Sequence, residues 1–509
     1  MTLTVMVQGT ASDVGKSLLC TALCRIFARK GFRVAPFKSQ NMALNSYVTQ
    51  DGKEIGRAQG VQAEAAGVPA TVDMNPILLK PKGDMTAQVV VRGVPIGDMS
   101  AIKYRTEYIP TALRMIEESL DRLRNQYDVI VIEGAGSPAE INLKERDIAN
   151  MKVAEVANAP VVLVADIDRG GVFASIVGTL ELLDAQERAR VKGIVINKFR
   201  GDIRLLESGL TWIEQRTGIP VLGVVPYQRD LYIESEDSVV LDQLSSAAAV
   251  NEVDVAVIRF PHISNFTDVD PLRYEPDVSI RFVSAPDQLG KPDLIILPGT
   301  KNTIEDLLWL QKKGLAARIE SLADTARILG ICGGYQMLGS KLYDPDLVES
   351  NIPEVEGLGL LDVRTRYLSA KTTVQVKGRV LELPDEASEL SGIPIEGYEI
   401  HMGQSERGNM QPFAQLLAAG GEKEDGAVNG HGTVIGTYLH GILHNDLYRR
   451  TFLDTIRMKK GLAPIGATTS NHRRRQEAFD QWADTVERAI NVELLFSIMQ
   501  EYKCEWNYN

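Results

Sequence analysis

Residues 4–17 read Thr-Val-Met-Val-Gln-Gly-Thr-Ala-Ser-Asp-Val-Gly-Lys-Ser. The first five residues predict a buried strand, and the pattern after Gly15 predicts a helix. Between them lies a Gly-x5-Gly-Lys-Ser loop, one residue longer than the usual phosphate-binding loop. Backbone N–H groups at a helix N-terminus attract phosphate. We therefore expect Gly15, Lys16 and Ser17 to bind ATP, with the Ser17 hydroxyl also on Mg²⁺.

A phosphate loop of this kind works with an acidic residue at the tip of another strand. Glu133 ends the apolar run 128–132 and is followed by small residues, so it is the predicted magnesium ligand. Asp51, in a polar loop, is a further candidate ligand. Asn197 directly follows the apolar run 193–196, where its amide is placed to read the edge of adenine.

The rest of the pattern predicts an α/β protein with two large domains. A chain of 509 residues exceeds what one core usually supports. Apolar runs alternate with helical stretches in both halves, which indicates parallel sheets flanked by helices. We predict a P-loop ATP-dependent synthetase domain over 1–236, a linker over 237–251, a second domain over 252–447 and a helical C-terminal extension over 448–509. The default expectation for the extension is packing onto the second domain.

Composition excludes several classes of protein. A net charge of -12 argues against general nucleic-acid binding. No apolar run reaches the length of about 18 residues that a membrane span needs, and the N-terminus does not resemble a signal peptide. The four cysteines fit neither a disulfide framework nor a zinc site. We expect a cytoplasmic protein whose oligomeric state stays open, a homo-oligomer included.

A second reactive element lies at residues 328–338, Ile-Leu-Gly-Ile-Cys-Gly-Gly-Tyr-Gln-Met-Leu. It has the form strand–turn–helix, with Cys332 in a Gly-x-Cys-x-Gly turn that exposes a nucleophile at a helix N-terminus. The helix dipole favours the thiolate, and backbone N–H groups can stabilise an oxyanion. Gly299, which ends a neighbouring strand, and Gly333 are the predicted oxyanion donors.

A thiolate nucleophile needs a base, and the chain has six histidines. His440 directly follows an apolar strand and precedes a glycine, which presents its imidazole at a sheet edge. His401 and His444 are interpreted as structural or substrate-facing. Cys332 and His440 are therefore the predicted catalytic pair.

Longer strings accompany these motifs along nearly the whole chain. They are Phe37-Lys38-Ser39-Gln40-Asn41-Met42, Asn75-Pro76-Ile77-Leu78-Leu79-Lys80-Pro81, Asp166-Ile167-Asp168-Arg169-Gly170-Gly171, Phe260-Pro261-His262-Ile263-Ser264-Asn265-Phe266-Thr267-Asp268 and Gly397-Tyr398-Glu399-Ile400-His401-Met402-Gly403. With them the chain resembles the cobyric acid synthase family, the glutamine-hydrolysing ligases of cobalamin biosynthesis. The first half is similar to dethiobiotin synthetase, and the second to flavodoxin-like class I glutamine amidotransferases.

The resemblance implies a reaction that spacing alone does not show. The family uses ATP and glutamine to amidate the b, d, e and g carboxylates of adenosylcobyrinic acid a,c-diamide, giving adenosylcobyric acid. Cys332 would attack the glutamine amide, and His440 would transfer the proton. The candidate contacts to the corrinoid are Lys38, Gln40, Asn41, Lys80 and Arg169.

One position departs from the class I pattern. Many class I amidotransferases carry His-Pro-Glu, in which the Glu orients the base, whereas His440 is followed by Gly-Ile. Asp446 and Glu399 are alternatives for the third member of the triad, and the sequence assigns neither. A weak glutaminase that becomes active only when the synthetase site is occupied follows as a hypothesis.

Two other functions share parts of this pattern. A cobyrinic acid a,c-diamide synthase has the same two chemistries, but the string over 38–42 argues against it. A non-catalytic ATP switch of the ParA/MinD group carries an additional early lysine in its phosphate loop, which residues 9–13 lack. Such a switch also has no use for Cys332.

Overall fold

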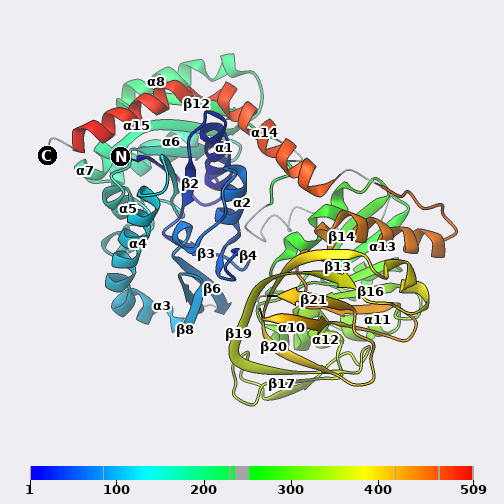
Figure 1. Cartoon of the computed structure of the whole chain (residues 1–509). Coiled ribbons are helices and arrows are strands. Elements are labelled where there is room, and N and C mark those ends of the chain that lie inside the picture. The colour runs from blue at the N-terminus through cyan, green and yellow to red at the C-terminus, as the bar shows by residue number, and fades with distance from the viewer. Residues whose placement is uncertain are drawn as a thin grey trace. The chain divides into compact units, whose positions relative to one another are not determined.

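Figure 1 shows the computed structural model. The residues that the structure describes are 2–83, 85–228, 231–234, 251–418, 420–467 and 470–506. The chain divides into two compact units, of which the first comprises Met1–Met42, Glu54–Ile233 and Arg474–Asn509 and the second Ala43–Lys53 and Glu234–Arg473. All of the predicted linker except Asn251 lies outside the described residues.

A six-stranded parallel sheet forms the centre of the first unit. Its order is β12-β11-β10-β1-β9-β2. The strands are β1 (Leu3–Gly9), β2 (Val34–Phe37), β9 (Val129–Glu133), β10 (Val161–Asp166), β11 (Val191–Phe199) and β12 (Val221–Pro226). Val7 pairs with Glu133 and Gly9 with Val164. The phosphate loop and Glu133 therefore leave the sheet at the same edge.

Helices and a smaller sheet complete the first half of the chain. The helices are α1 (Lys16–Arg29), α2 (Arg57–Ala65), α3 (Ala101–Lys103), α4 (Ile109–Arg124), α5 (Met151–Val156), α6 (Val172–Leu182), α7 (Ala185–Arg190) and α8 (Glu207–Thr217). The four-stranded sheet has the order β3 (Gln40–Met42), β6 (Ile77–Gly83), β7 (Thr86–Val91) and β8 (Val94–Ser100). Two short strands, β4 (Ser46–Val48) and β5 (Glu54–Gly56), lie between β3 and α2 in the sequence.

The second unit contains another mainly parallel sheet, of order β14-β13-β15-β16-β24-β23. Its strands are β13 (Val253–Ile258), β14 (Val278–Val283), β15 (Leu294–Leu297), β16 (Arg327–Ile331), β23 (Ala427–Val428) and β24 (Val434–Thr437). Without β23 the order is 2-1-3-4-5, the flavodoxin-like arrangement, in which ligands bind at the carboxyl ends of the strands. The helices are α9 (Pro286–Leu289), α10 (Thr303–Lys312), α11 (Leu315–Glu320), α12 (Gly333–Leu338) and α13 (Asp446–Lys459). The predicted two-domain α/β class is confirmed.

A second sheet belongs to the same unit. It contains β17 (Lys341–Tyr343), β18 (Glu354–Glu356), β19 (Val363–Val380), β20 (Pro394–Arg407), β21 (Ala414–Ala418) and β22 (Gly421–Asp425). The long strands β19 and β20 pair antiparallel, with a register shift between Tyr367 and Thr372. Strand β20 includes Tyr398, which stacks on the ring of His440, and Ile400, whose carbonyl oxygen lies 3.7 Å from the Cys332 sulfur.

The default expectation for the C-terminal extension holds for residues 448–473, which fold with the second unit, but it is wrong for residues 474–509, which fold with the first. Helices α14 (Asn471–Ala489) and α15 (Val492–Trp506) are red in Figure 1 and lie beside the blue helix α1. Their apolar residues join the core of the first unit. The indole Nε1 of Trp482 donates to the carbonyl of Leu18 at 2.7 Å.

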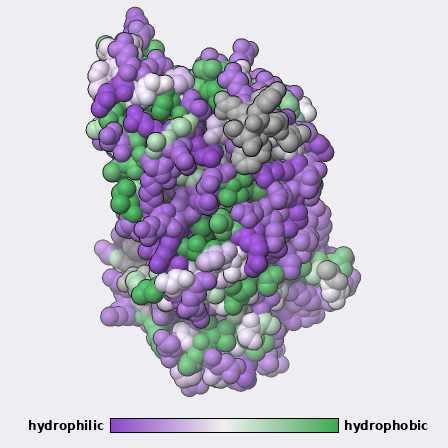
Figure 2. Space-filling model, turned by 90° about the vertical axis from the view of Figure 1, so that its left-hand side faces the viewer, coloured by the Kyte–Doolittle hydropathy of each residue, from purple (hydrophilic) through white to green (hydrophobic). Residues whose placement is uncertain are grey.

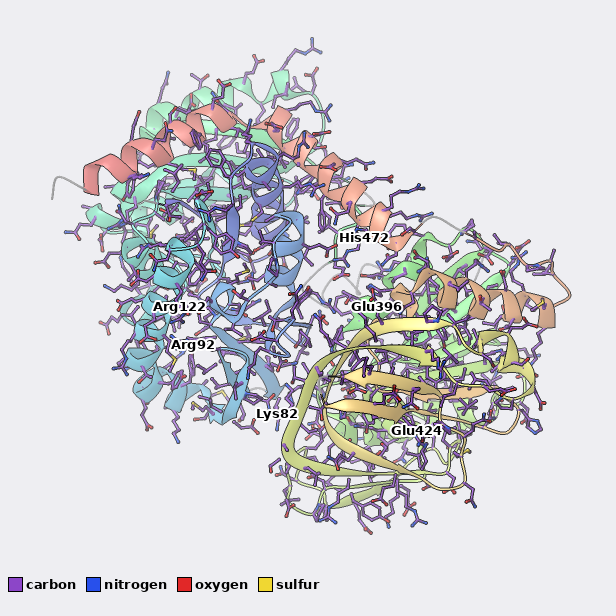
Figure 3. All side chains as sticks on the ribbon, in the orientation of Figure 1. Lys82, Arg92, Arg122, Glu396, Glu424 and His472 are labelled. Carbon is purple, nitrogen blue, oxygen red and sulfur yellow. The ribbon has the colours of Figure 1, made fainter. Side chains whose placement is uncertain are left out.

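Polar side chains cover much of the surface. Hydrophobic residues form smaller groups between hydrophilic ones on the face that Figure 2 shows. Lys82 and Arg122, which Figure 3 labels, belong to the first unit. Lys82 pairs with Asp98 at 2.8 Å and Arg122 with Asp73 at 2.6 Å. In each pair one side chain is about 41% exposed, and ion pairs that water can reach contribute little to stability. Within the described part of the chain, no helix combines the length and apolar character needed to cross a membrane.

Replacing Trp482 with alanine should destabilise the first unit by about 3–5 kcal/mol, because the indole is buried and its hydrogen bond to α1 is lost. Calorimetry measures this as a lower melting temperature for the transition that responds to ATP. Leu494→Ala is the control, since Leu494 is 37% exposed and its truncation should cost about 0.5 kcal/mol or less. Equal shifts for both variants would contradict the assignment.

Candidate functional site

The predicted phosphate loop joins β1 to α1. Gly15 adopts a positive φ of 99°, and a Cβ there would lie 2.1 Å from the amide nitrogen of Asn197. Lys16 extends back over the loop, where its Nζ donates to the carbonyls of Ala11 and Gly136 at 2.9 and 3.0 Å. Burial, assisted by nearby Lys38, lowers the pKa of Lys16 against the opposing effect of Glu133. The loop thus encloses a cation where the outer phosphates of a nucleotide would bind.

Glu133 is the centre of a buried polar cluster at the end of β9. Its Oε1 accepts from the Ser17 hydroxyl at 2.8 Å and from Lys38 Nζ at 2.9 Å. Its Oε2 accepts from Gln62 Nε2 at 2.6 Å. Burial opposes the charge on Glu133, but Lys38, Gln62 and Ser17 outweigh it and hold the pKa of the carboxyl below its ordinary value. The sequence predicted the proximity of Ser17 and Glu133, but it gave no signal for Gln62.

Asn197 is adjacent to the phosphate loop but already uses one amide hydrogen there. Its Nδ2 donates to the carbonyl of Val14 at 2.8 Å. The side chain therefore holds the loop, and its Oδ1 remains as the atom that could accept from an adenine amino group. Asp51 lies in the segment 43–53, which folds with the second unit, and its carboxylate accepts from the Thr49 hydroxyl. These observations do not support Asp51 as a ligand of the metal ion at the phosphate loop.

Most of the predicted corrinoid contacts have partners within the protein. Lys80 is buried and pairs with Glu54 at 2.7 Å. The Gln40 side-chain oxygen accepts from the Tyr104 hydroxyl at 2.6 Å, and Asn41 donates to Gln59 at 3.1 Å. Arg169 differs, because its side chain is 66% exposed and lies 3.8 Å from Asp13 in the phosphate loop. The sequence identified these residues but not how they pair.

Cys332 has the strained backbone expected of a nucleophile elbow. Its φ and ψ are 53° and −108°, and helix α12 begins at the next residue. A Cβ on Gly334 would lie 1.8 Å from the carbonyl of Leu297, so only glycine allows the helix to approach the end of β15 this closely. The thiol lies 3.7 Å from the carbonyl oxygen of Ile400 on β20.

The predicted oxyanion glycines lie beside Cys332 and His440, the predicted catalytic pair. A Cβ on Gly299 would lie 3.0 Å from the Cε1 atom of His440. A Cβ on Gly333 would lie 3.2 Å from the backbone nitrogen of Thr300. The structure therefore brings the backbone after β15 next to the elbow, which the separate motifs in the sequence did not require.

His440 is oriented by a carboxylate that the sequence reasoning missed. Its Nδ1 lies 2.6 Å from Asp268 Oδ2, and the other oxygen of Asp268 accepts from the Gly441 amide at 2.9 Å. Both side chains are 1% exposed. Burial opposes a charged ring, but Asp268 and Cys332 outweigh it and raise the pKa of His440 to about 10. The ring is therefore cationic at neutral pH.

Neither carboxylate considered from the sequence fills this role. Glu399 pairs with Lys423, and Asp446 pairs with Arg449. The only signal for Asp268 was its position at the end of the Phe260–Asp268 string. With an orienting carboxylate in place, the reason given for a weak glutaminase no longer holds.

The other two histidines near the sheet edge have different environments. His401 stacks on the Tyr438 ring at 3.8 Å, and burial lowers its pKa to about 3. It is therefore neutral, with Nδ1 donating to the carbonyl of Gly403 at 2.7 Å. His444 donates from Nε2 to the carbonyl of Thr267 at 3.0 Å. Tyr398 stacks on the His440 ring with a centroid distance of 5.1 Å.

Comparison with known proteins covers nearly the whole chain. Residues 254–448 match the family model of the CobB/CobQ-like glutamine amidotransferase domain, and residues 5–239 match the CobQ/CobB/MinD/ParA nucleotide binding domain. A cobyric acid synthase from Geobacillus sp. (strain WCH70) is 55% identical over 96% of this chain and 96% of its own length. Those of Sorangium cellulosum (strain So ce56) and Yersinia enterocolitica serotype O:8 / biotype 1B (strain NCTC 13174 / 8081) are 54% and 52% identical, covering 98% and 99% of both chains. The chain belongs to the cobyric acid synthase family.

As a member of the cobyric acid synthase family, the chain is a glutamine-dependent ligase of cobalamin biosynthesis. Its nucleotide-binding half contains the phosphate loop and Glu133, and its amidotransferase half contains Cys332 and His440. The family membership disfavours the a,c-diamide synthase and the ATP switch as functions for this chain.

Replacing Asp268 with asparagine should lower glutaminase kcat by about 100-fold or more, because the base loses its orienting partner. Since Asp268 raises the pKa of His440, the same change should lower that pKa. The imidazolium is then lost at lower pH, so the alkaline limb of the glutaminase pH profile should move to lower pH. Glutamate release measured across the pH range tests both effects.

The control for this variant is Asp446→Asn, which alters a carboxylate on α13 that pairs with Arg449. We expect it to keep the wild-type pH profile. Ammonia-dependent ligation by the Asp268→Asn variant should be retained. An unchanged alkaline limb in that variant would contradict a direct electrostatic role for Asp268.

Proposed function

We propose that this chain uses ATP and glutamine to amidate the b, d, e and g carboxylates of adenosylcobyrinic acid a,c-diamide, giving adenosylcobyric acid. The observation that carries the proposal is a buried Cys332–His440–Asp268 arrangement in a chain whose other half holds a phosphate loop around Lys16. The similarity to cobyric acid synthases over nearly their full length supports a corrinoid as the substrate.

The first half of the reaction activates a carboxylate. An oxygen of the substrate carboxylate attacks the γ-phosphorus of ATP, the bond to the β-phosphate oxygen breaks, and ADP leaves with the electron pair. The product is an acyl phosphate. Lys16 and the backbone N–H groups after Gly15 stabilise the charge on the transferred phosphoryl group, since donors already in position are the main source of such catalysis.

The donor set also fits Mg²⁺. This ion takes oxygen ligands and is usually held by one or two protein groups together with substrate phosphates. Ser17 Oγ and Glu133 Oε1 are 2.8 Å apart, and the Lys38 ammonium on the same carboxylate oxygen shows that a cation is favoured there. Ser17 and Glu133 would hold the ion, which supplies positive charge to the phosphates.

The second half of the reaction releases ammonia. Cys332 thiolate attacks the side-chain carbonyl carbon of glutamine, His440 gives its proton to the leaving nitrogen, and a glutamyl thioester forms. Water then hydrolyses the thioester to glutamate, with His440 accepting a proton. The Gly299 and Gly333 amides stabilise the oxyanion. The released ammonia attacks the acyl phosphate, and phosphate leaves as the amide forms.

The corrinoid contacts are proposed in two groups. Lys38 and Lys80 are buried, and each pairs with a carboxylate of the protein, Glu133 and Glu54 respectively. To bind the substrate, each lysine would exchange this partner for a carboxylate of the corrinoid. Gln40 and Asn41 lie on β3, and exposed Arg169 lies beside the phosphate loop.

Replacing Ser17 with alanine should raise the Mg²⁺ concentration needed for half-maximal ATP turnover by about tenfold or more, because one oxygen ligand is lost. Mg²⁺ titration of ammonia-dependent ligation measures this without involving the glutaminase. Ser12→Ala, in the same loop, is the control and should leave the Mg²⁺ requirement unchanged. Equal requirements in wild type and Ser17→Ala would argue against this ligand.

Replacing Cys332 with alanine tests the two-site ligase itself. With adenosylcobyrinic acid a,c-diamide and ATP, the variant should lose phosphate release and amide formation from glutamine but retain both from ammonia, because only the nucleophile is removed. Cys24→Ala removes a buried thiol of α1 and should retain both activities. If wild type shows no corrinoid-dependent ATP turnover with either nitrogen source, the substrate assignment fails.

A further inference from the structure

A short segment of the N-terminal half folds with the amidotransferase half. Residues 43–53, here called the clasp, belong to the second unit, although the residues on both sides of it belong to the first. Both flanks are anchored in the first unit, because Asn41 donates to Gln59 at 3.1 Å and Glu54 accepts from Lys80 at 2.7 Å. The clasp therefore links the β3 and β5 segments covalently to the second unit.

Hydrogen bonds and a close backbone approach join the clasp to the rest of the second unit. The backbone N–H of Ser46 donates to Asn265 Oδ1 at 2.9 Å. The side chain of Gln375 on β19 donates to the carbonyl of Val48 at 2.8 Å. Gly52 has a φ of 73°, and a Cβ there would lie 2.9 Å from the carbonyl of Thr373. The clasp is thus fixed both to the loop before Asp268 and to β19.

Asn265 connects the clasp to the glutaminase residues. It is 2% exposed and adopts a φ of 51°, a conformation that costs a non-glycine residue about 1 kcal/mol or more and persists only where its surroundings impose it. Its carbonyl accepts from the Asp268 amide at 3.0 Å. The preceding residue, Ser264, donates its N–H to the carbonyl of Gly299 at 2.9 Å. One loop therefore contacts the triad carboxylate and the oxyanion glycine.

We propose that the clasp positions Asp268 and the oxyanion backbone through Asn265, so that glutamine hydrolysis depends on the state of the segment that binds the corrinoid. This inference rests on the proposed function, because it takes β3 as part of the acceptor site. A shift of β3 on substrate binding would be carried along the chain to Ser46 and its hydrogen bond to Asn265. Asn265 is accordingly a positioning residue, and its effect on Asp268 is a coupling between two sites.

The experiment compares glutaminase activity with and without ATP and adenosylcobyrinic acid a,c-diamide, using the full chain. Wild type should be stimulated by about fivefold or more, the lower end of ordinary coupling. Asn265→Gly keeps the positive φ but removes the acceptor, and Gln375→Leu loosens the other anchor. Both should bring the stimulation close to onefold. Asn265→Asp keeps an acceptor and should retain the wild-type ratio.

Ammonia-dependent ligation in the same samples separates this inference from the proposed function. If wild type ligates from ammonia but its glutaminase is not stimulated, the clasp has no coupling role and the ligase function stands. If Asn265→Gly lowers glutaminase equally in both states, Asn265 is only structural and the inference is overturned. Loss of the stimulation in Asn265→Gly and Gln375→Leu, with ligation from ammonia retained, supports it.

Discussion

The glutaminase half depends on one buried contact, between Asp268 and His440. The two residues lie 172 positions apart in the sequence and are brought together because β13 and β24 end at the same edge of one sheet. A buried carboxylate is stable only when its oxygens are paired. His440 and the Gly441 amide contact the two oxygens of Asp268, so this carboxylate fixes the position of the proposed base.

The nucleotide-binding half also depends on a buried carboxylate, but the groups around it differ. Glu133 is also a buried carboxylate at the end of a central strand, with Ser17, Lys38 and Gln62 on its oxygens. In the second unit the carboxylate holds a histidine cationic beside a thiol, whereas in the first it concentrates cationic groups around the phosphate loop. In each unit the buried carboxylate and its cationic partner thus lie near the carboxyl ends of the parallel strands, where ligands bind in open α/β sheets.

Local motifs were the parts of the site that the sequence predicted well. Gly15 and Cys332 both have a positive φ, and each lies between a strand and a helix. Both features depend on a few neighbouring residues in the sequence, so a short motif predicts them. Asp268 was missed because its partner is set by strand order, which no short string encodes. The pairing of Lys80 with Glu54 was missed for the same reason, since a buried lysine and an exposed one look alike in sequence. The C-terminal helices were assigned by proximity along the chain, whereas their apolar faces match the core around α1.

The position of those helices has a consequence for synthesis on the ribosome. The first unit is completed by residues after 473, which leave the exit tunnel only after the entire second unit has been made. Until then, the first unit has an exposed apolar surface around α1, which α14 and α15 bury once they are made. Domains usually fold in the order in which they emerge, but here the amidotransferase half can reach its native core first. Chaperones that shield nascent chains would find their longest-lived target at the amino end of this protein.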